Sequence, residues 1–213
     1  MLDGPRWGPR QGRAEQLVVL CHGIGADGHD LIDLAPFWAT ALPRAAFAAP
    51  DGPEPCDGAP MGRQWFQLWD RSAAQLAAGA DRAVPLLGAF VDAELARLGL
   101  SGDAYALMGF SQGAMTVLHA GPRLAVPPRA ILAFSGALLA PERLGETVAR
   151  PPVLLVHGEA DEVVPAARSR EAGRALREAG FPVESLFCPR LGHGIDDAGL
   201  SVGALFLQRA FAG

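Results

Sequence analysis

The sequence contains few cysteines and no lysine, and both shortages exclude classes of protein. Its 3 cysteines, Cys21, Cys56 and Cys188, are odd in number, and their spacing fits neither a disulfide framework nor a zinc site. All 18 basic residues are arginine, they are scattered singly, and the net charge is −5 at pH 7. Nucleic-acid surfaces and basic membrane-binding helices need clustered positive charge, so we expect neither kind of partner.

Long apolar runs are also missing. No apolar stretch is long enough to cross a bilayer, and residues 1–16 lack the apolar core of a signal peptide. We therefore expect a cytoplasmic protein without membrane insertion. The chain shows no internal repeat and no linker, so we predict a single domain over residues 1–213, with residues 1–15 as a loosely ordered N-terminal arm.

Short apolar runs alternate with segments that have the apolar spacing of helices. Strands are expected at residues 17–20, 45–49, 105–108, 130–134, 153–156 and 182–187. Helices are expected at residues 30–42, with Asp30 as N-cap, and at 72–98, 112–119, 165–179 and 196–211. Pro85 should kink or restart the second helix, and residues 50–71 form a long loop. Because most strands are continuous apolar runs, we predict a mostly parallel α/β sheet with helices on both faces.

One strand leads directly into a helix through the segment 109–113, Gly-Phe-Ser-Gln-Gly. This pattern is typical of a nucleophile elbow, a turn so tight that a Cβ at Gly109 or Gly113 would meet neighbouring backbone. The turn holds Ser111 in a strained conformation with its hydroxyl above the sheet edge. A simple glycine-bounded turn has the same short pattern, so the rest of the chain must supply the partners of a nucleophile.

A serine nucleophile needs a histidine base and a carboxylate that orients it, in the chain order serine, acid, histidine. Of the 5 histidines, only His193 follows both the elbow and a candidate acid, and it lies in a Gly-His-Gly loop past the last strand. The loop after the preceding strand offers Glu159, Asp161 and Glu162 as acids. We favour Asp161 for its place between strand end and helix, and Glu159 is the alternative. The predicted triad is Ser111, Asp161 and His193.

An acyl-transfer oxyanion needs two fixed N–H donors. The backbone N–H of Gln112, at a helix N-terminus, is the first candidate. The second is the N–H of Ile24 in the early loop His-Gly-Ile-Gly. The alternative explanation of this loop is a simple turn whose glycines are needed only for positive φ. We interpret His22, the first residue of that loop, as a structural residue that orients it.

These motifs together resemble the phospholipase/carboxylesterase family of α/β-hydrolases, which includes acyl-protein thioesterases and small bacterial carboxylesterases. The resemblance covers nearly all of the chain from Leu17 on, and it rests on segments 22–28, 63–66, 109–113, 134–136, 157–165 and 192–194. It implies an α/β-hydrolase fold without a large lid. It also implies a serine esterase, without metal or cofactor, that cleaves small-molecule carboxylic esters of short-to-medium acyl chains through an acyl-enzyme.

The resemblance assigns a shallow acyl groove to the loop after the second strand. The apolar residues of this loop that we expect to bind the acyl chain are Met61, Trp65, Phe66, Leu68 and Trp69. Many members have Asp after the Trp-Phe pair, whereas this chain has Gln67, and this departure favours the bacterial carboxylesterase branch. The alternatives are a thioesterase or lysophospholipase and, from another class, a binding module without turnover. Dimers are common among relatives, so a homodimer is a further expectation of the resemblance.

Overall fold

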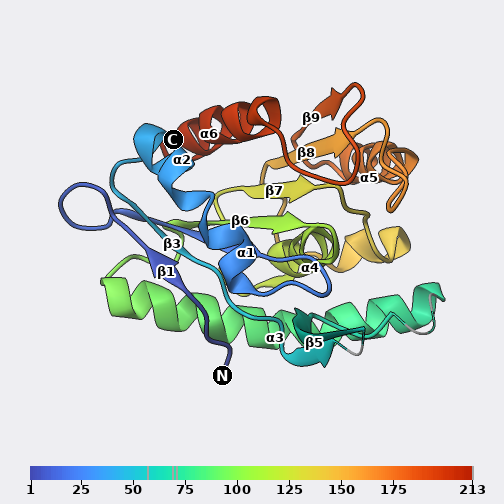
Figure 1. Ribbon diagram of the computed structural model, residues 1–213, viewed down its shortest axis with the longest axis horizontal. Coiled ribbons are helices and arrows are strands. Elements are labelled where there is room, and N and C mark those ends of the chain that lie inside the picture. Colours follow the sequence, from blue (N-terminus) through green and yellow to red (C-terminus); the bar gives the residue numbers. More distant parts are fainter. Residues whose placement is uncertain (57, 69, 71, 213) are drawn as a thin grey trace.

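A seven-stranded sheet lies between helices on both of its faces in the computed structural model, which describes residues 1–56, 58–68, 70 and 72–212 (Figure 1). The strand order is β1-β3-β2-β6-β7-β8-β9, and every neighbouring pair is parallel except β1 with β3. The strands are β1 Arg6–Trp7, β2 Gln16–Cys21, β3 Ala45–Ala48, β6 Tyr105–Phe110, β7 Ile131–Phe134, β8 Val153–Gly158 and β9 Val183–Cys188. The predicted, mostly parallel sheet is therefore confirmed.

The helices divide between the two faces of the sheet (Figure 1). They are α1 Gly28–Ile32, α2 Ala35–Ala41, α3 Ala73–Leu98, α4 Gln112–Ala120, α5 Ala167–Glu178 and α6 Asp197–Ala212, with two short 3-10 helices, η1 Gly121–Arg123 and η2 Pro141–Glu146. Alternate residues of β2 point to opposite sides: Leu17 packs into the core that includes α3, α4 and α5, and Val18 into the core with α1, α2 and α6. This two-sided burial explains why the strands read as continuous apolar runs. Among the described residues, no helix combines the length and apolar character that crossing a membrane requires.

The N-terminal segment, for which we expect a loosely ordered arm over residues 1–15, contains a strand and makes backbone hydrogen bonds to the rest of the chain. Its strand β1 pairs with β3 at the sheet edge, with Arg6 opposite Ala48. Arg6 also forms an ion pair of 2.7 Å between its Nη2 and Oε1 of Glu94, a buried carboxylate of α3. Backbone pairing and this partly buried ion pair hold the segment, and neither can be recognised from its polar composition.

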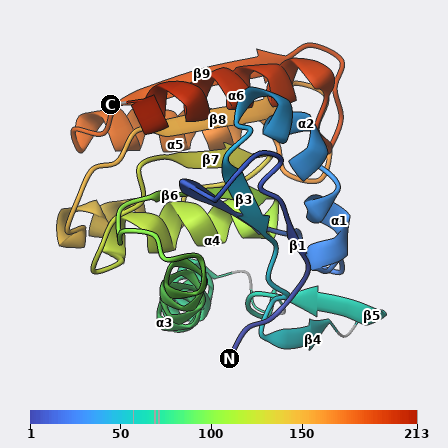
Figure 2. The same ribbon diagram turned by 90° about the vertical axis from the view of Figure 1, so that its left-hand side faces the viewer.

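Three local expectations also differ from the structure. The helix expected over residues 30–42 is two helices: Asp27, not Asp30, caps α1, and α2 begins at Ala35 with Pro36 in its first turn. The loop after β3 contains an antiparallel hairpin of β4 Glu54–Cys56 and β5 Ala59–Gln64, which projects below α1 in Figure 2. Pro85 lies on the exposed side of α3 and does not interrupt it, although proline has no N–H to donate to the preceding turn.

Candidate active site

The sharp turn between β6 and α4 holds Ser111 at the carboxyl edge of the sheet. Its φ of 54° and ψ of −115° lie outside the usual regions for a non-glycine residue. A Cβ on Gly109 would overlap the backbone of Gly113, and a Cβ on Gly113 would overlap the backbone of Cys21 at the end of β2. The two glycines therefore allow the close approach that keeps the serine in this strained conformation.

Ser111, His193 and Asp161 lie in one hydrogen-bonded row. His193 Nε2 is 3.0 Å from Ser111 Oγ, and His193 Nδ1 is 2.7 Å from Asp161 Oδ2. Asp161 follows β8 and His193 follows the neighbouring strand β9, so the parallel sheet brings the two loops to the same edge. The alternative acid, Glu159, pairs with Arg170 on the protein surface instead. The Phe110 ring contacts the imidazole of His193, with ring centroids 4.9 Å apart.

The carboxylate of Asp161 is buried and fully hydrogen-bonded. Its Oδ1 accepts hydrogen bonds from the backbone N–H groups of Val163 and Val164, each at 2.9 Å. Burial alone would raise the pKa of Asp161, but the bonds from His193, Val164 and Val163 outweigh this effect and keep the pKa below its usual value. Asp161 is therefore an anion at neutral pH, with one oxygen held by backbone and the other directed at His193.

The early glycine-rich loop packs directly against the elbow. An added Cβ on Gly23 would lie 3.3 Å from the Cβ of Ser111, and the next residue, Ile24, lines the same cavity as Ser111 and Gln112. His22 is buried at the end of β2, where its Nδ1–H donates to Gly23 O at 2.6 Å and its Nε2 accepts from Gly52 N at 2.8 Å. Burial lowers the pKa of His22, so it holds the loop as a neutral ring.

A cavity of about 340 Å³ opens beside Ser111, and its walls are mostly apolar. It is bounded by the loop after β2, the start of α3, the start of α4, and the loops after β7 and β8. Besides Ser111 and Gln112, its lining residues are Ile24, Leu68, Leu76, Met115, Ala137, Leu139, Val163, Val164, Pro165 and Arg168. An apolar cavity lined in part by a serine can accommodate an apolar chain attached to a reacting carbonyl group.

The structure separates the residues that we expected to form the acyl groove. Leu68 lines the cavity beside Ser111. Met61 instead points to solvent from β5, with 89% of its surface exposed. Trp65 and Phe66 are buried in the core, with at most 1% of their surface exposed, and are not among the residues that line that cavity. Trp69 lies outside the described residues.

Trp65 is hydrogen-bonded to two segments of the site, the early loop and the residue after Ser111. Its indole Nε1–H donates to the carbonyl oxygen of His22 at 2.9 Å, and its backbone N–H donates to the side-chain Oε1 of Gln112 at 2.9 Å. The side-chain Nε2 of Gln112 donates to the carbonyl oxygen of Phe66 at 2.6 Å. Sequence reasoning assigned only the backbone of Gln112 and did not find this role of its side chain, since no local pattern signals a bond between residues so distant in the chain.

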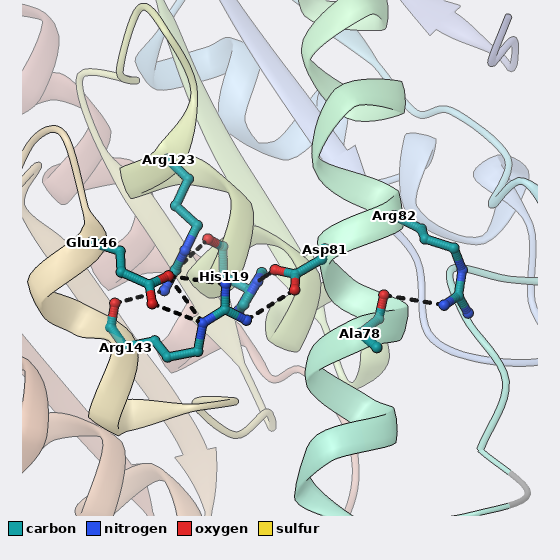
Figure 3. A network of polar contacts seen from close by, with 7 residues as sticks. All are labelled: Ala78, Asp81, Arg82, His119, Arg123, Arg143 and Glu146. Atoms are coloured by element: carbon teal, nitrogen blue, oxygen red, sulfur yellow. Dashed lines mark hydrogen bonds and ion pairs between the residues drawn. The ribbon is translucent and has the colours of Figure 1, made fainter.

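A polar network ties α4 to α3 and η2 (Figure 3). Asp81 of α3 accepts a hydrogen bond from His119 Nε2 of α4 at 2.7 Å and from Arg143 Nη1 of η2 at 2.9 Å. Arg123 donates to the carbonyl oxygen of His119 at 2.8 Å, and Arg143 also pairs with Glu146. Burial lowers the pKa of His119 more than Asp81 raises it. The network thus fixes the helix that begins at the elbow through a neutral buried histidine.

Comparison with known proteins identifies the family of this chain. The model of the phospholipase/carboxylesterase family matches residues 8–210. Esterase YpfH of Escherichia coli strain K12 is 34% identical over 188 residues, which cover 86% of this chain and 78% of that protein. Acyl-protein thioesterase 1 of Neurospora crassa is 27% identical over 202 residues, covering 87% of this chain and 82% of that protein.

A solved structure shares the whole architecture. The crystal structure of esterase PE8 covers 98% of this chain and 99% of its own, with 42% sequence identity and a TM-score of 0.92. The family match spans almost the entire sheet, and it includes the elbow and the loops that carry Asp161 and His193. This chain therefore belongs to the phospholipase/carboxylesterase family of α/β-hydrolases and is a carboxylesterase.

Proposed function

We propose that Ser111, His193 and Asp161 are the catalytic triad of this esterase, and that it cleaves esters of short-to-medium acyl chains. The observation that carries the proposal is the row of contacts from Ser111 Oγ through His193 to Asp161, at 3.0 and 2.7 Å, with Ser111 in the wall of an apolar cavity. The acceptor Nε2 faces the hydroxyl, and the donor Nδ1–H faces a carboxylate anion, which is the tautomer that a general base needs.

In the first step, His193 Nε2 takes the hydroxyl proton of Ser111 while Oγ bonds to the ester carbonyl carbon. The electron pair of the C=O double bond moves onto oxygen, and the backbone N–H groups of Ile24 and Gln112 bind this oxyanion. Asp161 stabilises the positive imidazolium that forms, which requires the carboxylate to remain ionised. Its lowered pKa supports that role.

In the second step, the tetrahedral intermediate collapses and its bond to the alcohol oxygen breaks. His193 gives its proton to the departing alcohol, and the acyl group remains esterified to Ser111. Water then attacks this acyl-enzyme while His193 accepts a proton from it, and the second collapse releases the carboxylic acid and returns the proton to Ser111.

The cavity supports the substrate class. Its volume of about 340 Å³ lies near the lower end of ligand pockets, which span about 300–1,000 Å³. Its walls contain aliphatic side chains such as Leu76, Met115 and Leu139, and Arg168 is the single charged side chain among the lining residues named above. An apolar, small cavity favours an unbranched acyl chain of limited length.

A thioester is the second candidate substrate, and the similarity to an acyl-protein thioesterase favours it. The same serine attack would apply, with a thiol rather than an alcohol as leaving group. A lysophospholipid ester would also present an acyl chain to the cavity. A binding module without turnover is disfavoured, because binding alone needs no serine hydroxyl paired with a histidine and a buried carboxylate.

The test is hydrolysis of p-nitrophenyl esters from acetate to palmitate by the wild type and by Ser111→Ala. Ser135→Ala is a matched control, since Ser135 is also a buried serine with positive φ at the end of the neighbouring strand β7. We expect wild type and Ser135→Ala to show the same chain-length optimum and Ser111→Ala to lose turnover. A fluorophosphonate should label the first two proteins only. Wild-type turnover in folded Ser111→Ala would overturn the proposal.

A further inference from the structure

Asp161 faces a second histidine besides His193. Nε2 of His157 lies 3.2 Å from Asp161 Oδ2, the same oxygen that His193 Nδ1 contacts at 2.7 Å. His157 is the penultimate residue of β8 and is buried, with 1% of its surface exposed. The proposed mechanism assigns no role to this ring, although it is one of the nearest polar groups to the triad acid.

The contacts of His157 define its tautomer. Its Nε2 lies 2.7 Å from the carbonyl oxygen of Val164, which can only accept, so Nε2 carries a hydrogen. Its Nδ1 lies 2.6 Å from the Oγ of Ser169 on α5, and that oxygen is 3.3 Å from the carbonyl oxygen of Gly136. The ring therefore links the loop after β8 to α5.

The segment that His157 holds is the one that orients Asp161. The N–H groups of Val163 and Val164 both donate to Asp161 Oδ1 at 2.9 Å, while the carbonyl oxygen of Val164 accepts from His157. One peptide segment thus binds the carboxylate on one side and the imidazole on the other. A shift of this turn would rotate the carboxylate relative to His193.

We propose that His157 is a positioning residue that acts through Asp161. Its Nε2–H anchors the turn 161–164 through the carbonyl oxygen of Val164, and its ring lies 3.2 Å from Oδ2, so that this oxygen stays directed at His193. The proposal rests on the triad proposed above and adds a second histidine to it. A role restricted to stability, in which His157 only joins β8 to α5, would not depend on the charge of Asp161.

A double-mutant cycle separates these roles. His157→Leu removes the contacts of both ring nitrogens at similar volume, and we expect it to lower kcat by about 10- to 100-fold, as a small misplacement of a catalytic group does. In an Asp161→Asn background the same substitution should change kcat by less than about threefold, because residues that act as one unit are strongly non-additive. An equal loss in both backgrounds, or no loss, would overturn the proposal.

His119 supplies the matched control. It is as buried as His157 and also contacts an aspartate, Asp81, but it belongs to the network between α3 and α4. His119→Leu should lower the melting temperature and should change kcat by the same small factor with or without Asp161→Asn. His157→Gln retains an N–H donor at the position of Nε2, and we expect it to recover most of the activity that His157→Leu loses. Failure of this recovery in a folded protein would count against positioning.

A measurement without substrate distinguishes this proposal from the proposed function. The low-field proton resonance of the Asp161–His193 hydrogen bond should be present in the wild type, His157→Gln and His119→Leu, and shifted or broadened in His157→Leu. Ser169→Ala, which removes the partner of Nδ1, should shift it less. An unchanged resonance in His157→Leu overturns the positioning role. Absence of Ser111-dependent hydrolysis in the wild type overturns the proposed function instead, and the resonance can still be compared between the variants in that case.

Discussion

The side chain of Gln112 accepts a hydrogen bond from the backbone N–H of Trp65 at 2.9 Å, although 47 residues separate the two in sequence. The same amide donates to Phe66 O at 2.6 Å. The residue that follows the proposed nucleophile therefore has two functions. Its backbone N–H is a proposed oxyanion donor, and its side chain holds the segment of Trp65 and Phe66, which in turn contacts the carbonyl oxygen of His22.

Replacing this amide should destabilise the protein. In Gln112→Ala, the buried N–H of Trp65 and the carbonyl oxygen of Phe66 lose their partner, which should lower the free energy of unfolding by about 2–4 kcal/mol. Urea unfolding measures the loss. Gln208→Ala is the control, since exposed Gln208 also donates to a backbone carbonyl group, that of Ala41, and it should change stability by less than about 0.5 kcal/mol. Equal effects of the two substitutions would contradict this role of Gln112.

The assignment of the acid can be tested against its alternative. Asp161→Asn keeps the shape of the side chain and removes its charge, so we expect kcat to fall by about 10⁴-fold, as in other triads. Glu159→Gln should leave kcat within about twofold, because Glu159 pairs with Arg170 at the surface. Steady-state rates on one activated ester provide the comparison. A large loss from Glu159→Gln together with a small loss from Asp161→Asn would exchange the two roles.

Stability should fall in mild acid. Burial lowers the folded-state pKa of His22 and of His119 below the value of 6.5 that we take for the unfolded chain. The unfolded state therefore takes up these protons first, and stability is complete above pH 6.5 and decreases below it by about 1.4 kcal/mol per pH unit for each histidine. Thermal melting from pH 8 to 5 measures this slope.

A variant without one of these rings checks the cause. His119→Gln should have a shallower slope of melting temperature against pH than the wild type, while His29→Gln, at a side chain that is 76% exposed, should keep the wild-type slope. An unchanged slope in His119→Gln would show that other groups control the loss. At lower pH, stability should fall further as Asp81, whose pKa is lowered by Arg143 and His119 against the effect of burial, becomes protonated.

Acyl-chain preference should respond to the wall of the cavity and not to the hairpin. Met115→Trp places a larger side chain in the wall beside Ser111, so the rate ratio of octanoate to acetate esters should fall by at least about tenfold. Met61→Trp makes the same change at a residue that is 89% exposed on β5, and this ratio should stay at the wild-type value. A change of this rate ratio in Met61→Trp would show that the hairpin contributes to acyl-chain binding.

Much of the fold could be predicted because its signals are local. The strands of the parallel sheet are buried on both faces, so residues such as 17–20 and 153–156 form continuous apolar runs. The hairpin at residues 54–64 could not be recognised, since its strands lie apart from the main sheet and are rich in proline and glycine. The pairing of β1 depends on a partner strand about 40 residues away and has no local pattern.

The sequence by itself determined the family, the strand-turn-helix around Ser111 and the order of an acid and His193 after it. These features follow from backbone sterics at glycine, apolar periodicity and the scarcity of histidine. Only the tertiary structure decided which side chains surround the cavity and that Trp65 is hydrogen-bonded to Gln112. It also decided that His157 and His193 both lie close to Oδ2 of Asp161. The physical reason is that these contacts join separate loops at one edge of the sheet, and their distances depend on how the strands are ordered and packed.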